Sequence, residues 1–514
     1  MQRALRLIER WCNENELTVN PKKTEMILFT NKRKIELTKP PTLFNTSLEL
    51  SAEVKYLGVT LDSKLSWKRH TEDKTKKSLA ILNQCKRMLG KKWGLKPKIM
   101  KWLYLSVVRC SLTYAALVWW PRTLLTTAQQ ELQKFQRQAC LAITGCMSTT
   151  PTAALEVILG IPPLHIHIKE EATLAALRLK TSGHWKEQNT MHTKILGQNI
   201  NKEPRLQWKC DRTEKQHILD KNYKINSEKN LDPKPAQDTI EVYTDGSKTK
   251  TGTGAGAYCQ ELNMRISHAL GKDNSVFQAE CVGIMTAAIA VANRQVTNFK
   301  ININSDSQAA LKALARFSTT SQLIQDCHKT LETLAMSNDI TLRWVKGHDG
   351  DQGNEAADAL ARKATTLKVI GPEPIVPIPF SEYKTWLHEL TLKEHSQLWA
   401  NTTDCRQAKE AFPNIDKRQT NKLLRLDRGK LRKVVGLITG HSPLNKHLFV
   451  IGVTDSPLCR ACMEVDETPT HVVLECTGVA EQRERHLGSP TSFHEALGNL
   501  GGLLGFWSEL GWLE

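Results

Sequence analysis

The stretch Ile240-Glu241-Val242-Tyr243-Thr244-Asp245-Gly246-Ser247 decides the fold of the central part of this 514-residue chain. Apolar and polar side chains alternate through its first residues, which predicts a half-buried strand that ends at Asp245. Ligand sites in α/β sheets gather at the carboxyl ends of strands, so a carboxylate at this position is a candidate functional group.

The residues that follow predict an α/β domain. The expected elements are hairpin strands over 255–260 and 264–270, an apolar helix over 276–293, a strand over 299–305, helices over 307–316 and 320–336, a strand over 339–345 and a helix over 352–366. A strand–helix–strand connection of this length is right-handed, so the strand 299–305 should lie parallel to the strand 240–245.

Four acidic residues in this region have distinctive local contexts. Asp245 and Asp306 each end a predicted strand, Glu280 lies near the start of the apolar helix, and Asp358 lies where a Gly-rich loop enters a helix. Carboxylates brought together repel unless cations lie between them, and oxygen ligands favour Mg²⁺ or Mn²⁺. Two such ions suit in-line displacement at phosphorus, and no Ser/His/Asp or Cys/His grouping competes as a nucleophile.

The motifs Thr244-Asp245-Gly246-Ser247, Ala279-Glu280, Ser305-Asp306-Ser307 and His348…Asn354-Glu355-Ala356-Ala357-Asp358 resemble a type 1 ribonuclease H domain over residues 238–366. The resemblance implies a mixed five-stranded sheet with flanking helices, two Mg²⁺ (or Mn²⁺) ions, and hydrolysis of the RNA strand of RNA–DNA hybrids. It implies catalytic and metal-binding roles for Asp245, Glu280, Asp306 and Asp358. His348 would assist the leaving group or product release, and Gly246 and Ser247 would contact the nucleic acid.

The positive charge of the chain is unevenly distributed. Residues 1–236 carry 41 Lys/Arg and 21 Asp/Glu, whereas residues 237–514 carry 30 and 32. An excess of this kind is expected where a protein lies along a polyanion. A second, local basic stretch runs from 417 to 433, and its predicted nucleic-acid-binding residues are Lys417, Arg418, Arg425 and Arg428. A solvated helix face is the alternative interpretation of this stretch.

The first 180 residues resemble part of a reverse transcriptase from non-long-terminal-repeat (Jockey-like) retrotransposons. The match rests on the run 17–24, on Lys55-Tyr56-Leu57-Gly58-Val59 and on Asp62, Leu65, Trp67 and His70. It implies a partial palm and primer grip over 1–70 and a helical thumb over 71–180. The polymerases of that family need an Asp-Asp pair, and no such dipeptide occurs in this sequence. The chain is expected to begin downstream of the polymerase metal site, so nucleotide addition by this chain alone is not expected.

The last three of the thirteen cysteines have the spacing of a metal site. Cys459, Cys462, His471 and Cys476 lie close together in sequence, and thiolates with one imidazole suit tetrahedral Zn²⁺. The segment resembles the zinc knuckle that follows ribonuclease H in the same polyproteins, which implies a small basic helical region with a structural Zn²⁺ over 401–514. The other ten cysteines are scattered, as in a reduced intracellular protein; the sequence does not distinguish nucleus from cytoplasm.

Two connecting segments complete the predicted organisation. Residues 181–237 are polar and end in Pro233 and Pro235, which predicts a linker. Residues 367–400 begin with Pro372, Pro374, Pro377 and Pro379 and predict a stiffer spacer. No signal peptide is visible, and the apolar run 112–120 is too short to span a membrane, so no membrane partner is expected.

Three functions remain open from the sequence. The first is a ribonuclease H that acts on RNA–DNA hybrids. The second is a non-catalytic protein that binds RNA or single-stranded nucleic acid through its basic regions and zinc knuckle. The third is a reverse transcriptase whose missing palm is supplied by another chain.

Overall fold

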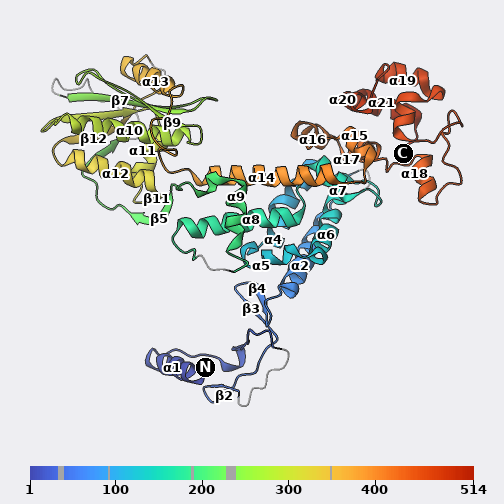
Figure 1. Ribbon diagram of the computed structural model, residues 1–514, viewed down its shortest axis with the longest axis horizontal. Coiled ribbons are helices and arrows are strands. Elements are labelled where there is room, and N and C mark those ends of the chain that lie inside the picture. Colours follow the sequence, from blue (N-terminus) through green and yellow to red (C-terminus); the bar gives the residue numbers. More distant parts are fainter. Residues whose placement is uncertain (33–39, 91–92, 187–189, 227–238, 348–349, 514) are drawn as a thin grey trace. The chain divides into compact units, whose positions relative to one another are not determined.

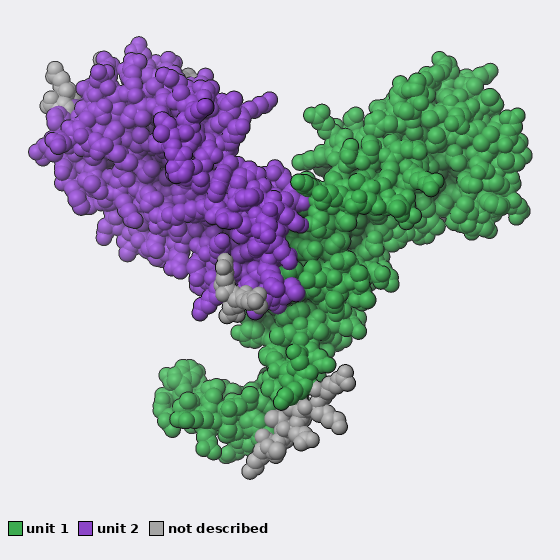
Figure 2. Space-filling view, in the orientation of Figure 1, with its two compact units in different colours: residues 1–172, 391–514 green, residues 173–390 purple. Residues whose placement is uncertain are grey.

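The computed structural model describes residues 1–32, 40–90, 93–186, 190–226, 239–347 and 350–513 (Figure 1). The chain divides into two compact units, which Figure 2 shows in different colours. Unit 1 comprises Met1–Ala172 and Thr391–Glu514, and unit 2 comprises Thr173–Leu390. The division falls inside two long helices, α8 (Leu164–Thr181) and α14 (Phe380–Asn401).

Unit 2 is built around a six-stranded mixed sheet in the order β6-β12-β10-β7-β8-β9. Its strands are β6 (Lys224–Asn226), β7 (Thr239–Lys248), β8 (Thr253–Cys259), β9 (Met264–Gly271), β10 (Lys300–Ser305) and β12 (Asp339–Trp344). β10 is parallel to both β7 and β12, as a right-handed crossover predicts, whereas β7, β8 and β9 are antiparallel. The predicted α/β fold with a mixed sheet is confirmed.

Helices cover both faces of this sheet (Figure 1). On one face, α13 (Gln352–Ala364) packs against β7, β8 and β9. On the other, α10 (Val276–Asn293) packs against β7 and β8, α12 (Gln322–Ala335) against α10, and α11 (Gln308–Ala315) against β12. Val242, Ile303, Leu342 and Val282 are fully buried in the core that forms there. Burial of such apolar side chains is the main stabilising contribution to the fold.

Within the described residues, α10 is long and apolar enough to cross a membrane by length and composition, and so is the bent pair Pro97–Leu112 with Ala116–Leu124. The buried side chains of α10, among them Ile284 and Val291, belong to the core of unit 2. Packing against the sheet therefore accounts for the apolar composition of α10.

The segment 181–237, predicted as a linker, contains folded elements. They are α9 (Lys194–Lys202), η4 (Pro204–Gln207), β5 (Arg212–His217) and β6. β5 pairs antiparallel with β11 (Ser318–Ser321), and β6 adds a sixth strand beside β12, so the predicted five-stranded sheet was one strand short. Backbone hydrogen bonds hold such short edge strands, which need few apolar side chains. Residues 227–238, with the prolines of the predicted linker, lie outside the described residues.

The predicted spacer 367–400 also differs from the structure, because α14 begins at Phe380. Tyr383, Trp386 and Leu387 are almost fully buried on this helix. Their spacing of three and four residues is a helical signal that the nearby prolines obscured.

Unit 1 is mainly helical. Its first part comprises α1 (Gln2–Glu14), η1 (Pro21–Lys23), β1 (Thr42–Leu43), β2 (Thr46–Ser47), β3 (Glu53–Tyr56), β4 (Val59–Asp62), α2 (Lys68–Lys86), α3 (Pro97–Leu103), η2 (Tyr104–Val108), α4 (Arg109–Leu112), α5 (Ala116–Trp119), η3 (Trp120–Leu124), α6 (Thr126–Thr144) and α7 (Thr152–Leu159). Its last part comprises α15 (Arg406–Ala411), α16 (Lys417–Leu424), α17 (Arg428–Thr439), α18 (Asn445–Val450), η5 (His471–Glu475), η6 (Thr477–Val479), α19 (Ala480–Leu487), α20 (Phe493–Gly498) and α21 (Leu500–Leu510).

Helices from the first and the last part of the chain pack together in unit 1. α16 packs against α7 and α17 against α6, and the hydroxyl of Thr420 donates to the carbonyl of Ile158 at 2.9 Å. The region 401–514, predicted as separate from the thumb-like region 71–180, therefore shares one compact unit with it.

Several residues that carry the reverse-transcriptase resemblance have structural roles. The carboxylate of Asp62 accepts the backbone N–H groups of Ser66 and Trp67 at 3.0 Å each. The buried His70 ring accepts the N–H of Thr60 through Nδ1 at 3.1 Å. These bonds join strand β4 to the start of α2.

Candidate metal centres

Two of the predicted acids lie at the same level of two neighbouring strands, Asp245 within β7 and Asp306 directly after β10. Ser305 of β10 pairs in parallel register with Thr244 of β7, so Asp306 and Asp245 each follow a paired residue at the same level of the sheet. β7 does not end at Asp245 as expected but continues to Lys248, paired with β8. Asp245 therefore pairs with Gly256 of β8, and the residue before it, Thr244, is the last that pairs with β10.

Glu280 comes from the second turn of α10. A capping box of Ser275 and Gln278 defines where this helix begins. Gly246 lets the helix approach β7, because a Cβ at that position would lie 2.5 Å from the backbone nitrogen of Glu280. Gly246 therefore allows close packing, and its predicted contact with nucleic acid stays a prediction.

The three carboxylates form a compact group. One oxygen from each of Asp245, Glu280 and Asp306 lies within 4.8 Å of the others. Asp245 and Glu280 are buried, and the Oε2 atom of Glu280 is buried without a hydrogen-bond partner among the described residues. Carboxylates at this spacing, one with an unused lone pair, are a donor set that suits Mg²⁺ or Mn²⁺.

The raised pKa values of two of these carboxyl groups also indicate a site for a cation. Burial, followed by the charges of Asp245 and Asp306, raises the pKa of Glu280 to about 9. Burial, followed by the charges of Asp306 and Asp358, raises the pKa of Asp245 to about 7. Clustered carboxylates without a cation retain protons because ionising all of them is unfavourable, and a divalent ion would reverse that preference.

Asp358 stands slightly apart from the other acids. It lies on α13, and its Oδ1 atom forms a salt bridge with Nε of Arg362, one turn later, at 2.8 Å. It is near enough for its charge to raise the pKa of Asp245, but it is not part of the group of three. Sequence reasoning placed all four acids together and missed the competing arginine.

His348 lies outside the described residues. The preceding residue, Gly347, lies against Asp306, since a Cβ there would be 2.7 Å from Oδ2. The indole Nε1 of Trp344 donates to the backbone carbonyl of Asp306 at 3.0 Å. Sequence reasoning missed both contacts, which attach the end of β12 to the acidic group.

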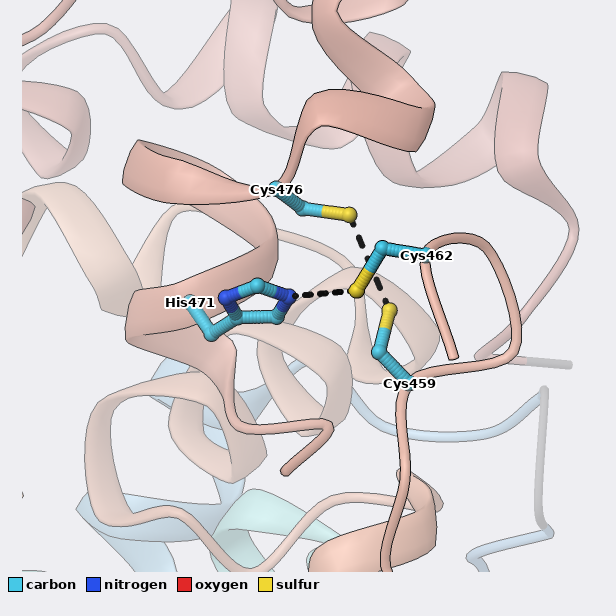
Figure 3. A group of neighbouring side chains, drawn as sticks. All are labelled: Cys459, Cys462, His471 and Cys476. Atoms are coloured by element: carbon cyan, nitrogen blue, oxygen red, sulfur yellow. Dashed lines mark hydrogen bonds between the residues drawn. The ribbon is translucent and has the colours of Figure 1, made fainter. Parts of the chain in front are cut away.

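Figure 3 shows the second candidate centre, in unit 1. The sulfur atoms of Cys459 and Cys476 are 3.7 Å apart, and the sulfur of Cys462 lies 3.4 Å from Nε2 of His471. A tetrahedral Zn²⁺ with Zn–S near 2.3 Å and Zn–N near 2.0 Å places such ligand atoms roughly 3.5–3.8 Å apart. All four ligand atoms lie within 4.8 Å of one another, so the cluster fits zinc.

The thiols of this cluster differ in acidity. The backbone N–H groups of Glu464 and Val465 lower the pKa of Cys462 to about 6. Burial raises the pKa of Cys476 to about 12. A thiolate stabilised by backbone donors is the form in which cysteine binds a metal.

The predicted nucleic-acid-binding residues of the basic stretch fall into two groups. Lys417, Arg418 and Arg425 are exposed on and just after α16. Arg428 is half-buried and donates to the backbone carbonyls of Gly90 and Ala142. Ser247, the remaining predicted contact, lies on β7 opposite Gly254 and is partly exposed.

Comparisons with known proteins identify the central segment. The family model described as RNase H matches residues 237–366. A ribonuclease H of Hyphomonas neptunium is 30% identical over 142 residues, which cover 25% of this chain and 93% of that protein. A probable RNA-directed DNA polymerase from transposon BS of Drosophila melanogaster is 28% identical over 146 residues, covering 28% of this chain and 16% of that protein.

A Pol polyprotein from the type-1 retrotransposable element R1 of Bradysia coprophila is 26% identical over 178 residues, covering 34% of this chain and 18% of that protein. The chain thus spans less than a fifth of three retrotransposon relatives that it matches, with 16% to 18% of their length covered. The expected relationship to retrotransposon polyproteins is confirmed by these matches. Through residues 237–366, with their mixed sheet and acidic group, the chain belongs to the ribonuclease H family.

Proposed function

We propose that unit 2 hydrolyses the RNA strand of RNA–DNA hybrids with two divalent metal ions. The observation that carries the proposal is the group of Asp245, Glu280 and Asp306, whose oxygens lie within 4.8 Å of one another at one place on the sheet. Similarity to proteins named ribonuclease H supports the same chemistry.

The acidic residues would hold the ions in different ways. Asp245 on β7 and Asp306 directly after the paired strand β10 would bind them most directly, and Glu280 would contribute its unpartnered Oε2 from α10. Asp358 would complete the second metal site by leaving Arg362. Bound there, Mg²⁺ or Mn²⁺ would supply an activated water and stabilise the alkoxide leaving group. Preference for RNA would come from the 2′-hydroxyl and helix shape.

The test is cleavage of a labelled RNA–DNA hybrid by the purified chain, with and without Mg²⁺. Wild-type protein should cut only with the metal, and Asp306→Asn or Asp245→Asn should abolish cutting. The control is Glu241→Gln, which should stay active. The carboxylate of Glu241 accepts hydrogen bonds from the side-chain amides of Asn302 and Asn304 on the sheet and is not part of the acidic group. Equal cleavage by wild type and both Asp variants would remove the proposal.

A nucleic-acid-binding role is proposed for unit 1. Its support is the exposure of Lys417, Arg418 and Arg425 on one helical segment. The zinc knuckle would hold this end of the chain in shape, because four protein ligands leave no position open for catalysis. Strong, salt-sensitive RNA binding without metal-dependent hydrolysis would favour this role as the only function of the chain.

The zinc assignment is tested by metal analysis. Purified protein should contain one Zn²⁺ per chain, and Cys459→Ser should lose the metal and destabilise unit 1. Cys405→Ser is the matched control, since Cys405 lies outside the cluster. Wild-type protein without zinc after purification in zinc-supplemented buffer would contradict the assignment.

The printed sequence contains no Asp-Asp pair, which the polymerases it resembles need. The purified protein should therefore fail to extend a primer on an RNA template. Extension by the isolated chain would show that its own residues suffice.

A further inference from the structure

Unit 1 contains a hollow of about 530 Å³ between α2, α6 and α17, and none of its lining residues belongs to a candidate metal centre. Three cationic side chains line it: Lys86 from α2, and Arg428 and Arg432 from α17. Its described lining includes no Asp or Glu. Lys86 and Arg428, some 340 positions apart in sequence, therefore line one positively charged hollow.

The cations of this hollow are held by neutral groups. Arg428 donates through Nε to the carbonyl of Gly90 at 3.1 Å and through Nη1 to the carbonyl of Ala142, in the last turn of α6. Lys86 donates to Oε1 of Gln138 at 3.3 Å. Carbonyl and amide dipoles orient a cation without cancelling its charge, so both side chains keep theirs.

Neighbouring carboxylates do not neutralise the hollow within the described chain. The nearest acid in sequence to Arg428 is Asp427, which caps α17 and pairs with Lys430 at 3.3 Å. Gly145, at φ 71°, leaves room for the Arg428 guanidinium, since a Cβ there would lie 3.3 Å from its Cζ atom. The hollow thus presents positive charge that lacks a partner of opposite sign, which is the condition for binding an anion.

An exposed aromatic ring adjoins this site. Trp93 is 66% exposed, and its indole lies directly over Gly90, where a Cβ would come within 2.1 Å of Nε1. The Gly90 N–H donates to the carbonyl of Trp93 at 2.9 Å, which holds the two residues together. An indole left in water beside a cationic hollow is the pairing of groups found in sites for unstacked bases and their phosphates.

We infer that this hollow binds a backbone phosphate of single-stranded nucleic acid, while Trp93 stacks on an adjoining base. Lys86 and Arg432 attract the phosphate by their charge. Arg428 does the same, and its hydrogen bond to Ala142 of α6 holds its guanidinium in a fixed place in the hollow. Bases paired in a duplex offer no free face to an indole, whereas those of a single strand do. The inference rests on the proposed nucleic-acid binding of unit 1, not on the nuclease activity of unit 2, and it gives that binding a specific site.

The first test uses the full-length chain, a fluorescein-labelled 20-nucleotide oligo(dT) and anisotropy at several salt concentrations. The variant Lys86→Gln/Arg432→Gln should bind about tenfold more weakly, and its slope of log K against log salt should fall by about 1. The control Lys393→Gln/Arg406→Gln removes equal charge from exposed positions on α14 and α15 of the same unit. It should bind within about twofold of wild type and keep the slope.

The second test separates stacking from charge. Trp93→Ala should weaken oligo(dT) binding by about tenfold, the loss expected for one stacked base, and leave the salt slope unchanged. All variants should keep the wild-type melting temperature, because the replaced side chains are exposed or only partly buried. Asp306→Asn should bind oligo(dT) with wild-type affinity, because Asp306 belongs to the acidic group of unit 2 and not to the hollow. Binding to oligo(dT) therefore tests the hollow independently of hybrid cleavage.

Other outcomes would overturn the inference. If the Lys86/Arg432 variant matches its control, or Trp93→Ala binds like wild type, the hollow is not the site. If inorganic phosphate or AMP displaces oligo(dT) at equal phosphate concentration, the hollow is a site for free phosphate or a mononucleotide instead. If wild-type protein fails to bind oligo(dT), the proposed nucleic-acid binding of unit 1 fails as well, while hybrid cleavage by unit 2 is unaffected.

Discussion

At the level of single residues, the acidic group depends on small neighbours as much as on its carboxylates. Gly246 admits the start of α10, and Gly347 lies against the carboxylate of Asp306. A Cβ at position 246 would lie 2.5 Å from the backbone nitrogen of Glu280, and a Cβ at position 347 would lie 2.7 Å from Oδ2 of Asp306. These glycines therefore set the distances between the acids.

Gly246→Ala should disrupt the site without removing an acid. The new Cβ would lie 2.5 Å from the Glu280 nitrogen, so α10 must shift, at a cost of about 1–3 kcal/mol. Hybrid cleavage should fall well below the wild-type rate at the same Mg²⁺ concentration. Gly197→Ala in α9, with nothing within 4 Å of the added carbon, is the control; it should keep wild-type activity and be about 0.5–1 kcal/mol more stable, because Ala favours a helix over Gly. Wild-type activity in Gly246→Ala would contradict this role.

A buried carboxyl in unit 1 predicts a pH effect on stability. Burial raises the pKa of Glu156 to about 7. Gln136 donates to Glu156 at 2.6 Å and accepts from the hydroxyl of Tyr104. Because the folded state holds this proton more tightly than the unfolded chain, Glu156 should destabilise unit 1 progressively as pH rises from about 4.5 to 7.

Glu156→Gln should remove that dependence. The variant should match wild type near pH 4.5 and be more stable by about 3 kcal/mol at pH 8, measured by denaturant unfolding. The exposed Glu131→Gln, on α6, should show no such trend. An equal difference between Glu156→Gln and wild type at every pH would contradict the prediction.

At the level of elements, helix α10 carries Glu280 to the strands and must begin at a defined residue. Its capping box satisfies backbone N–H groups of the first turn. Ser275→Ala should cost about 1 kcal/mol and loosen that turn. A higher Mg²⁺ concentration should then be needed for half-maximal hybrid cleavage.

The matched control for this prediction is Ser492→Ala. Ser492 caps α20 in unit 1 by accepting the N–H of Glu495 at 3.2 Å. It should lose a similar free energy of unfolding, about 1 kcal/mol, with an unchanged Mg²⁺ requirement. The same shift in both variants would mean that the α10 cap has no specific effect on the acidic group.

At the level of the whole molecule, the ribonuclease H fold is completed by residues before 238. Tyr223 is buried and bonds to His328 of α12. Asp211 accepts the N–H of Leu323 at 2.8 Å and the hydroxyl of Ser321 at 2.7 Å. The segment that the sequence predicted as a linker therefore stabilises the sheet and the start of α12.

A fragment of residues 173–390 should consequently be more stable than one of residues 238–366. The shorter fragment lacks β5, β6 and the buried ring of Tyr223, a loss on the order of 3 kcal/mol or more. Urea unfolding of the two fragments measures the difference. Equal unfolding free energies would show that residues 173–237 contribute nothing to the domain.

The sequence by itself determined the helix 276–293, the parallel pairing of β7 with β10 and the meeting of Asp245 with Asp306, because periodicity and crossover handedness are local or topological rules. Only the tertiary structure decided the strand β6, the pairing of Asp358 with Arg362 and the cationic hollow of α2 and α17. A three-residue strand such as Lys224–Asn226 has too few residues to show a period and forms only where another strand offers a free edge. Likewise, a side chain's partner depends on which groups packing brings near, which no local pattern records.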